Sequence, residues 1–520
     1  MNTEKHIKAH SSCEIKRSGP CGYVIFGASG DLSVRKLLPA VFSLFEKKRV
    51  PGNFFVAGYS RTKMDDKAFR GIAEDAVYKA YPGASAEAVK DFVSRCYYVR
   101  GEYDSGEDYS KLKKTINELE KKYSTKGNMI FHIATPPFVY ENILKGLSAA
   151  GLAEKENTGD SFFKRIIIEK PFGRDSSSAK HLDDVIEERF TEKQIYRIDH
   201  YLGKETVQNI ITFRFANTIF EPIWTNECVD NIQITVFEQE SVGHRTGYFE
   251  KSGLLRDMFQ NHILQLAALV GMERPDDLSP DSIRDGKVKF MSSIKPIARG
   301  DKDIIRAQYG RGTGGPAGTK AYREEEGADP KSCTETFFAL KFFVENKRWK
   351  GVPFYVRAGK AMDEKTTRIT IVFKKALPCP VCAGDGEETS EPNALIFSIH
   401  PQQGVFIDFA AKIPGSKNCM APVEMKFNYK DIFGSQMNED YATLILDCMT
   451  GDQTLYWRRD GMEISWNLVT PVLEKWESCT YDKKAGMMSI YPAGSSGPPE
   501  ADEFIKKDGR NWMTGYKKEQ

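Results

Sequence analysis

Four short apolar runs, separated by helical segments, constrain the first 200 residues more than any other feature. Each run has the length and the β-branched or aromatic content of a buried strand. They are Tyr23–Phe26, Phe54–Gly58, Asn128–Ala134 and Arg165–Glu169. Helical periodicity fills the intervals, at about 32–48, 65–80, 86–94 and 109–123. This alternation predicts a doubly wound, Rossmann-like α/β domain over residues 21–200.

The first apolar run ends in a turn that contains two glycines, Gly27-Ala28-Ser29-Gly30-Asp31-Leu32, and a helix is expected after it. In this context glycines let the backbone approach a pyrophosphate, which helix N–H groups then bind. The turn is an incomplete G-x-G-x-x-G, so a purely structural turn is the alternative. Arg61 follows the second run, where an arginine suits the 2′-phosphate of NADP. The residues therefore favour NADP over NAD.

Polar residues follow the other two runs. Thr135 comes after the third run and Lys170 after the fourth, and a proline follows each of them. Ligands of doubly wound sheets bind beyond the carboxyl ends of the strands. The prolines keep the backbone there out of helix, and either X-Pro bond could be cis.

The stretch Tyr196–Glu205 concentrates polar side chains around a glycine. Asp199, His200, Tyr201 and Lys204 lie within six positions, and the apolar residues between them are too few for a strand or helix face. The glycine indicates a turn. The last three side chains can donate hydrogen bonds to one anion, whereas a solvated loop is the alternative.

Beyond residue 200 the apolar residues alternate with polar ones. The pattern is visible at 231–238, 405–409 and 423–429. Short alternating strands predict a second, α+β domain over 201–520 with a large, mainly antiparallel sheet. Residues 1–20 are polar and are expected to form a disordered tail. The stretch Gly310–Gly318 is expected to be a loop, and it lacks the lysine of a P-loop.

One helix of this second domain carries a histidine among apolar residues. The positions Leu255, Met258, His262, Leu266 and Leu269 recur at spacings of three and four. A hydrogen-bonded core histidine is one interpretation. With Asp257 nearby, the other is a general base, because a buried imidazole beside a carboxylate titrates near neutral pH.

Composition excludes several classes of function. The net charge of +2 gives no whole-chain footprint for nucleic acid or an anionic membrane. No apolar run is long enough to span a bilayer. The ten cysteines are scattered, which favours reduced thiols and a cytoplasmic protein. Cys379 and Cys382 form a lone CxxC, so no metal site is predicted. Cys13 and Cys21 are expected to be surface thiols without a function, and a redox-sensitive role is the alternative.

Five motifs together give the chain a resemblance to the glucose-6-phosphate dehydrogenase family. They are GASGDL at 27–32, EKPFG at 169–173, RIDHYLGKE at 197–205, RDMFQNH at 256–262 and VPFYVRAGK at 352–360. The resemblance implies oxidation of glucose 6-phosphate at C1, with NADP⁺ as the cofactor. It also implies a homo-oligomer, a dimer or a tetramer.

The resemblance also implies roles for single residues. His262 matches the general base, and Asp199 matches the carboxylate that orients it. The substrate-binding positions are Lys170, His200, Tyr201, Lys204, Glu238, Asp257, Lys360 and Lys365. The cofactor-binding positions are Gly27, Ala28, Ser29, Gly30, Asp31, Leu32, Arg61, Thr135 and Lys170.

Two positions depart from the family pattern. Lys365 stands where relatives often carry arginine, and His400 stands where a polar amide is common. Both keep polarity, so the reaction class is expected to hold. The alternatives are a dehydrogenase of another hexose or hexose phosphate, and a non-catalytic NADP(H) sensor. A sensor is expected to have lost the base or its partner, and this chain has both.

Overall fold

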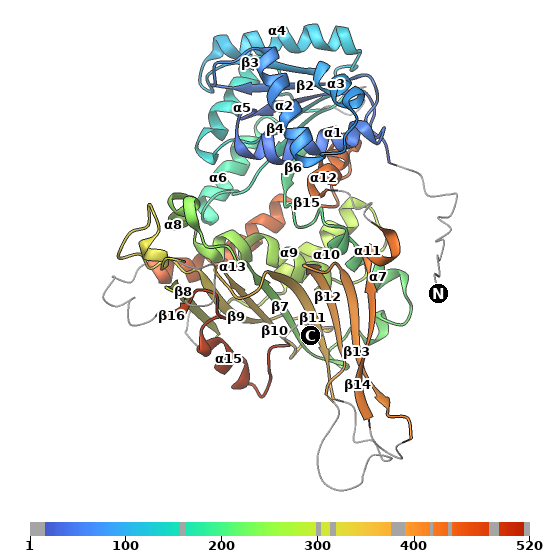
Figure 1. Ribbon diagram of the computed structural model, residues 1–520, viewed down its shortest axis with the longest axis vertical. Helices are drawn as coiled ribbons and strands as arrows, with labels where there is room; N and C mark the ends of the chain where they lie inside the picture. Colours follow the sequence, from blue (N-terminus) through green and yellow to red (C-terminus); the bar gives the residue numbers. More distant parts are fainter. Residues whose placement is uncertain are drawn as a thin grey trace. The chain divides into compact units, whose positions relative to one another are not determined.

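The computed structural model describes residues 16–156, 162–297, 303–312, 319–375, 391–415, 420–434, 439–477 and 488–513 (Figure 1). The chain forms two compact units. The first contains the described residues up to Phe172, together with Leu182–His200 and Glu439–Trp457, and the second contains the rest. This division differs from the expected boundary after residue 200, because 173–181 belong to the second unit and 439–457 to the first.

Several expectations fall on parts of the chain that are not described. The described residues do not include Cys13, Cys379, Cys382 or most of the stretch 310–318. Of the expected N-terminal tail, the structure describes residues from Lys16 onward. The Lys16 ammonium pairs with Asp447 at 2.6 Å and with Asp452 at 2.8 Å, so this part of the tail is tied to the first unit.

The first unit is built on a sheet with the strand order β15-β6-β5-β4-β1-β2-β3. Its strands are β1 (Cys21–Phe26), β2 (Phe54–Ser60), β3 (Cys96–Arg100), β4 (Met129–Ile133), β5 (Lys164–Ile168), β6 (Ile195–Ile198) and β15 (Tyr456–Trp457). All neighbours run parallel except β15, which pairs antiparallel with β6. Every residue of β1, β2 and β4 is buried, which explains their continuous apolar sequences. The Rossmann-like prediction is confirmed.

Helices of the first unit lie in two groups around this sheet (Figure 1). They are α1 (Leu38–Glu46), α2 (Asp66–Ala80), α3 (Ala86–Ser94), α4 (Gly106–Tyr123), α5 (Tyr140–Ala149) and α12 (Asp440–Thr450), with the short η1 (Ser33–Leu37), η2 (Pro137–Val139) and η3 (Glu192–Gln194). Helices α1, α2 and α3 pack on one another, α12 packs on α1, and α4 packs on α5. The N-caps Asp65, Ser85 and Ser105 each accept a backbone N–H, which fixes where α2, α3 and α4 begin.

The polar stretch at 196–205 contains more regular structure than its sequence predicted. Residues Ile195–Ile198 form β6 and are all buried, and Glu205 begins helix α7 (Glu205–Ala216). Between these two elements, residues 199–204 form a turn, which confirms the expectation that they make neither a strand nor a helix face. Arg197 is 0% exposed because ion pairs with Asp183 and Glu192 neutralise it inside the unit.

The second unit contains a sheet with the order β14-β13-β12-β11-β7-β10-β9-β8-β16. Its strands are β7 (Val229–Phe237), β8 (Ile304–Gly310), β9 (Phe337–Phe343), β10 (Pro353–Gly359), β11 (Thr366–Phe373), β12 (Ala394–His400), β13 (Gly404–Lys412), β14 (Met420–Asn428) and β16 (Ser489–Pro492). Only the pairs β7–β10 and β8–β16 run parallel. This confirms the predicted large, mainly antiparallel sheet.

Helices complete the second unit, and α7 and α11 pack on the strands β12 and β14. The helices are α7, α8 (Thr246–Leu254), η6 (Leu255–Ile263), α9 (Leu264–Gly271), α10 (Pro280–Ser292), α11 (Tyr429–Phe433), α13 (Arg459–Glu477) and α15 (Pro499–Lys506), with the short η4 (Glu221–Ile223), η5 (Gly243–Arg245) and η7 (Tyr322–Glu324); α6 (Ser176–Glu187) has residues in both units. Phe259 of η6 meets Phe338 and Phe342 of β9 edge to face. The predicted helix through His262 is therefore present, but its first nine residues are wound as a π-helix.

The outer strand β14 departs from the expected alternation. Val423 is 36% exposed and Met425 is 60% exposed, although both lie on the side predicted to be covered.

Cys21 departs from its prediction in the opposite sense. It is buried in β1, and desolvation raises the pKa of its thiol to about 12, so the expected surface thiol is wrong.

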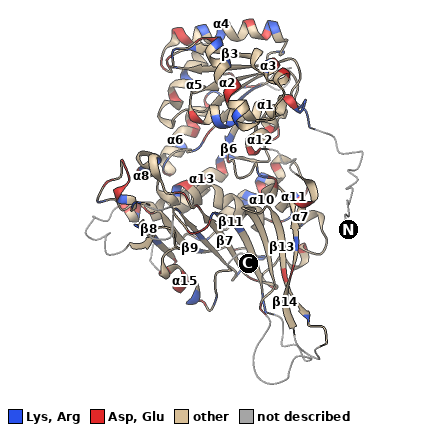
Figure 2. Ribbon diagram, viewed as in Figure 1, with Lys and Arg blue, Asp and Glu red and all other residues tan. Residues whose placement is uncertain are grey.

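Charged residues are interspersed along both units (Figure 2). In the described part of the chain, no helix combines the length and the apolar character that crossing a membrane requires.

Candidate active site

The glycine turn after β1 is tight and is held against its neighbours. Gly27 has a φ of +84°, and its N–H donates to the Tyr59 carbonyl at 2.9 Å. A Cβ at this position would lie 2.5 Å from the carbonyl oxygen of Ala134, so only glycine fits. Gly30 closes the turn by donating to the Gly27 carbonyl at 2.9 Å.

Hydroxyl groups join this turn to the end of β2, a feature that the sequence did not reveal. The Ser29 hydroxyl lies 2.9 Å from that of Ser60 and 2.8 Å from that of Thr62. Arg61 lies between those two partners in the sequence, and its guanidinium lies 5.6 Å from the centre of the Tyr103 ring. The turn and Arg61 are therefore neighbours, as a site for both a pyrophosphate and a 2′-phosphate requires.

The other three residues of the turn have different surroundings. Asp31 is exposed and pairs with Arg35 at 2.8 Å, one turn along the helix. Leu32 leads directly into η1, and the Ala28 side chain is fully buried.

Thr135 lies beside the turn. Its Cγ2 atom would be 3.1 Å from a Cβ at Gly27, and its hydroxyl is buried without a hydrogen-bond partner among the described residues. A buried hydroxyl without a partner is unfavourable unless a ligand supplies one. The turn thus suits the pyrophosphate of a bound dinucleotide, and Arg61 suits its 2′-phosphate. Thr135 offers a hydroxyl to another polar atom of the same ligand.

Lys170 follows β5 and directly succeeds a buried carboxylate, Glu169. A chain of hydrogen bonds holds that carboxylate: Tyr23 to His132 at 2.6 Å, His132 to Glu169 at 3.0 Å, and Tyr441 to Glu169 at 3.3 Å. The Lys170–Pro171 peptide bond is cis. Lys170 therefore extends from a backbone whose position is fixed from several elements of the first unit.

The residues after β6 belong to both units. Asp199 is 1% exposed, and the His200 ring stacks on Tyr441 of α12, with centroids 6.5 Å apart and planes within 6°. Tyr201 belongs to the second unit, where its ring stacks on His262 at 4.3 Å between centroids. Asp199 and His200 end the segment Leu182–His200 of the first unit, and the second unit resumes at Tyr201.

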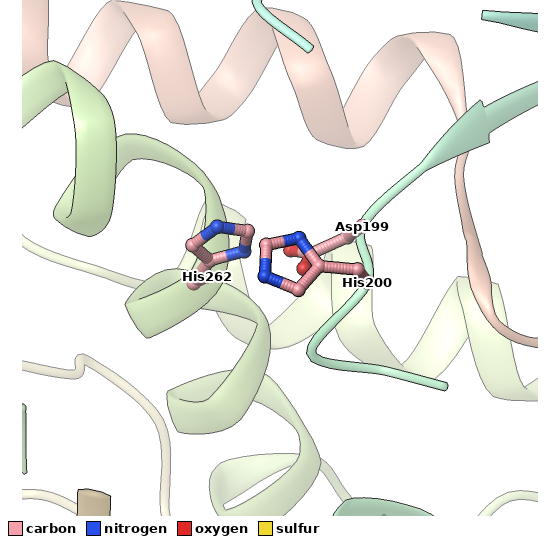
Figure 3. A group of neighbouring side chains, drawn as sticks. All are labelled: Asp199, His200 and His262. Atoms are coloured by element: carbon pink, nitrogen blue, oxygen red, sulfur yellow. The ribbon is translucent and has the colours of Figure 1, made fainter. Parts of the chain in front are cut away.

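His262 is the buried histidine of η6, with an exposed fraction of 1%. Figure 3 shows it on this helix, and shows Asp199 and His200 on the segment that follows β6. The helix is anchored near this point because Gln260 donates to the Ser465 hydroxyl of α13 at 2.8 Å.

A lysine and two carboxylates meet where β7 and β10 end. The two strands are parallel neighbours, so Glu238 and Lys360 leave the sheet at the same edge. The Lys360 ammonium forms an ion pair with Glu238 and lies 3.9 Å from Asp257 of η6. Lys360 and Asp257 are both 5% exposed. The structure therefore brings together three of the residues that the sequence named separately.

Two further cations gather around His400. Burial lowers the pKa of His400, and the charges of Lys365 and Lys204 lower it further. Lys204 immediately precedes α7, and Lys365 pairs with Glu240 at 2.8 Å on the surface. A third basic side chain beside two lysines marks a region suited to a divalent anion such as a phosphate. Glu240 was not named from the sequence, and no motif pointed to it.

Comparison with known proteins decides the family. Residues 24–209 match the glucose-6-phosphate dehydrogenase NAD binding domain, and residues 211–513 match the C-terminal domain of the same enzyme. The chain belongs to the glucose-6-phosphate dehydrogenase family. The two matches meet at about residue 210, whereas the first unit recruits 439–457 from much later in the chain.

Relatives cover nearly the whole chain. The glucose-6-phosphate 1-dehydrogenase of Chlamydia pneumoniae is 44% identical over 95% of this chain and 96% of its own length. The enzyme of Chlamydia muridarum is 40% identical over 96% of this chain and 99% of its own length. A solved glucose-6-phosphate dehydrogenase in complex with its substrate glucose-6-phosphate is 32% identical, covers 96% of this chain and 100% of its own, and has a TM-score of 0.86.

The two positions at which this chain departs from the family pattern, Lys365 and His400, are neighbours in space. Lys365 and His400 lie close enough for the lysine charge to lower the histidine pKa. No sequence pattern connects them, because strand β11 and the rest of β12 lie between them in the chain.

Proposed function

We propose that this chain oxidises glucose 6-phosphate at C1 to 6-phospho-D-glucono-1,5-lactone and reduces NADP⁺ to NADPH. This is the first step of the oxidative pentose phosphate pathway. The observation that carries the proposal is the buried His262, whose ring stacks on that of Tyr201. Asp199 is two residues before Tyr201 in the chain.

Oxidation at C1 removes a hydride from carbon and a proton from the hydroxyl oxygen. His262 is assigned as the base that accepts the hydroxyl proton, since it is a buried imidazole on a fixed helix. Asp199 is assigned to orient the imidazole and to stabilise the imidazolium that forms. NADP⁺ supplies the hydride acceptor when it is bound.

The remaining residues bind and position the sugar phosphate. Lys204 and His200, with Lys365 and His400 nearby, are assigned to the phosphate end, and Tyr201 packs between the base and Lys204. Glu238, Asp257 and Lys360 are assigned to the sugar hydroxyls. Lys170 is assigned to both substrate and cofactor. Binding the phosphate far from C1 lets that binding energy position the reacting end.

Cofactor binding is assigned to the glycine turn and its neighbours. Gly27 to Leu32 would hold the pyrophosphate, Arg61 the 2′-phosphate, and Thr135 a polar group through its buried hydroxyl. If Arg61 makes this contact, Arg61→Ala shifts the preference from NADP⁺ toward NAD⁺. An unchanged ratio of the two kcat/KM values would show that the 2′-phosphate is bound elsewhere.

The first experiment follows NADPH absorbance with purified protein, NADP⁺ and glucose 6-phosphate, then repeats it with NAD⁺ and with glucose. We expect turnover that requires the phosphorylated sugar. His262→Asn is expected to lower kcat by about 10²–10⁴-fold with little change in substrate affinity. A loss confined to KM would assign His262 to binding. Lys204→Ala is expected to raise KM for glucose 6-phosphate, and an unchanged KM would remove Lys204 from the phosphate site.

No metal is assigned to the reaction, although Asp199, His200 and His262 carry ligand types that also suit a divalent cation. We therefore expect full activity after dialysis against EDTA. Loss of activity, with recovery on adding a defined divalent cation, would replace the general-base assignment with a metal-dependent one.

A homo-oligomer also remains a proposal. It is supported by the apolar side chains Val423 and Met425 on β14, a strand at the end of the second sheet. Sedimentation of the purified protein tests it, with Met425→Lys expected to shift the distribution toward monomer. A cytoplasmic location stays a prediction from the scattered cysteines.

A further inference from the structure

A polar pocket lies entirely within the second unit. Its volume is about 310 Å³, and none of the residues assigned above lines it. The walls come from the end of α8, the start of η6, strand β8, the segment 329–335 and the last turn of α13. Its size is at the lower end of the range for small-molecule sites.

Arg306 of β8 is the unusual residue of this pocket. It is 7% exposed, yet the described residues offer its side chain no hydrogen bond and no carboxylate at ion-pair distance. Its guanidinium lies 5.2 Å from the centre of the Trp476 ring. A buried cation without a counter-charge is unfavourable, so the fold keeps Arg306 in place at a cost in stability.

The other charges of the pocket do not relieve this cost. Arg256 is already used: it donates to Glu477 at 2.6 Å and to the Arg174 carbonyl at 2.8 Å. The buried Glu335 accepts the Leu255 N–H at 2.9 Å. Its burial raises its pKa, which the charges of Arg256 and Arg306 only partly oppose. Glu250, Asp329, Lys251 and Lys331 also line the pocket, and none of its four carboxylates lies within ion-pair distance of Arg306.

We infer that this pocket binds the oxyanion group of a small metabolite, a phosphate or a carboxylate, through Arg306, with the rest of the ligand against Trp476. The fork of an arginine matches both groups with two parallel hydrogen bonds. The Trp476 ring, over which the guanidinium lies at 5.2 Å from the ring centre, lines the same pocket. The pocket also adjoins Gly253 and Arg256, at the beginning of the helix that carries Asp257 and His262. Its ligand would therefore contact the first turn of that helix.

The test measures binding to the full-length protein by calorimetry and by tryptophan fluorescence. Three probes separate the sources of the anion: inorganic phosphate, citrate and adenosine monophosphate. All titrations are repeated in Lys204→Ala, to remove binding at the proposed substrate phosphate site. Saturable binding that persists in Lys204→Ala is expected for at least one probe, and the strongest probe identifies the class.

Variants at the arginine decide the inference. Arg306→Met is expected to weaken binding at least about tenfold, since a hydrogen-bonded charged group is lost. Arg306→Lys keeps the charge without the fork and is expected to have an intermediate effect. Arg311→Met is the matched control, because it removes one exposed arginine just beyond the same strand and should leave binding unchanged.

Two results would overturn the inference. One is the absence of saturable binding of all three probes to the wild-type protein. The other is equal affinity in wild type, Arg306→Met and Arg306→Lys. Because Arg306→Lys retains a buried cation on the same stem, it decides the question even if Arg306→Met does not fold. Neither result bears on the proposed dehydrogenase reaction, which is measured separately by NADPH formation.

Discussion

The ion pairs of Arg197 support a strong prediction about stability. The guanidinium is fully buried in β6, two residues before Asp199. It donates to one oxygen of Asp183 at 2.9 and 2.7 Å and to both oxygens of Glu192 at 2.9 Å. Burial opposes the charge on Arg197, but the two carboxylates outweigh it and raise the arginine pKa. The strand that carries Asp199 is therefore held by a neutralised buried cation.

Asp183→Asn removes one of the two counter-charges and keeps nearly the same shape. Removing one partner of a buried ion pair costs about 3–5 kcal/mol. Glu192 remains bound and is partly exposed, so we expect the lower half of that range. For a unit of this size the loss corresponds to roughly 6–16 °C in Tm.

The assay is thermal and urea unfolding, followed by circular dichroism. Asp184→Asn is the control, since it makes the same chemical change at the next, exposed position of α6 and is expected to cost less than about 0.5 kcal/mol. If Asp183→Asn costs no more than this control, Arg197 does not depend on Asp183 for its charge, and the argument from burial fails.

Three further predictions concern the second unit and the glycine turn. Lys360→Met leaves the carboxylate of Glu238 without its ion-pair partner, and we expect kcat/KM to fall by about 10-fold or more while Tm changes little. If the variant loses activity only because it unfolds at the assay temperature, the ion pair is structural. The pKa of His400 is lower in the folded protein than in the unfolded chain, so its contribution to stability is present above pH 6.5 and is lost as pH falls through the folded pKa. The decrease of Tm on acidification should therefore be smaller in His400→Asn. Gly27→Ala should lower Tm and weaken NADP⁺ binding through left-handed strain of about 1–2 kcal/mol plus a clash with backbone, whereas Gly52→Ala, in open space, should do neither. Calorimetry with NADP⁺ checks that pair, and equal affinities would place the cofactor away from the turn.

The sequence alone determined the features that depend on local patterns. Strands β1, β2, β4 and β5 were predictable because the inner part of a parallel sheet is buried on both faces, which requires continuous apolar runs. His262 was predictable as a buried residue because helical spacing placed it among leucines. The motifs around it identified the family before any contact was known.

The tertiary structure decided what depends on partners far away in the sequence. Residues Ile195–Ile198 form a strand because Arg197 finds Asp183 and Glu192, and no local pattern shows that the charge is neutralised. The segment 439–457 joins the first unit because β15 pairs with β6, more than 250 residues earlier. The same holds for Arg306, whose missing counter-charge becomes visible only when five separate segments close around it. Burial and charge balance are properties of the whole chain, so they appear only in the folded protein.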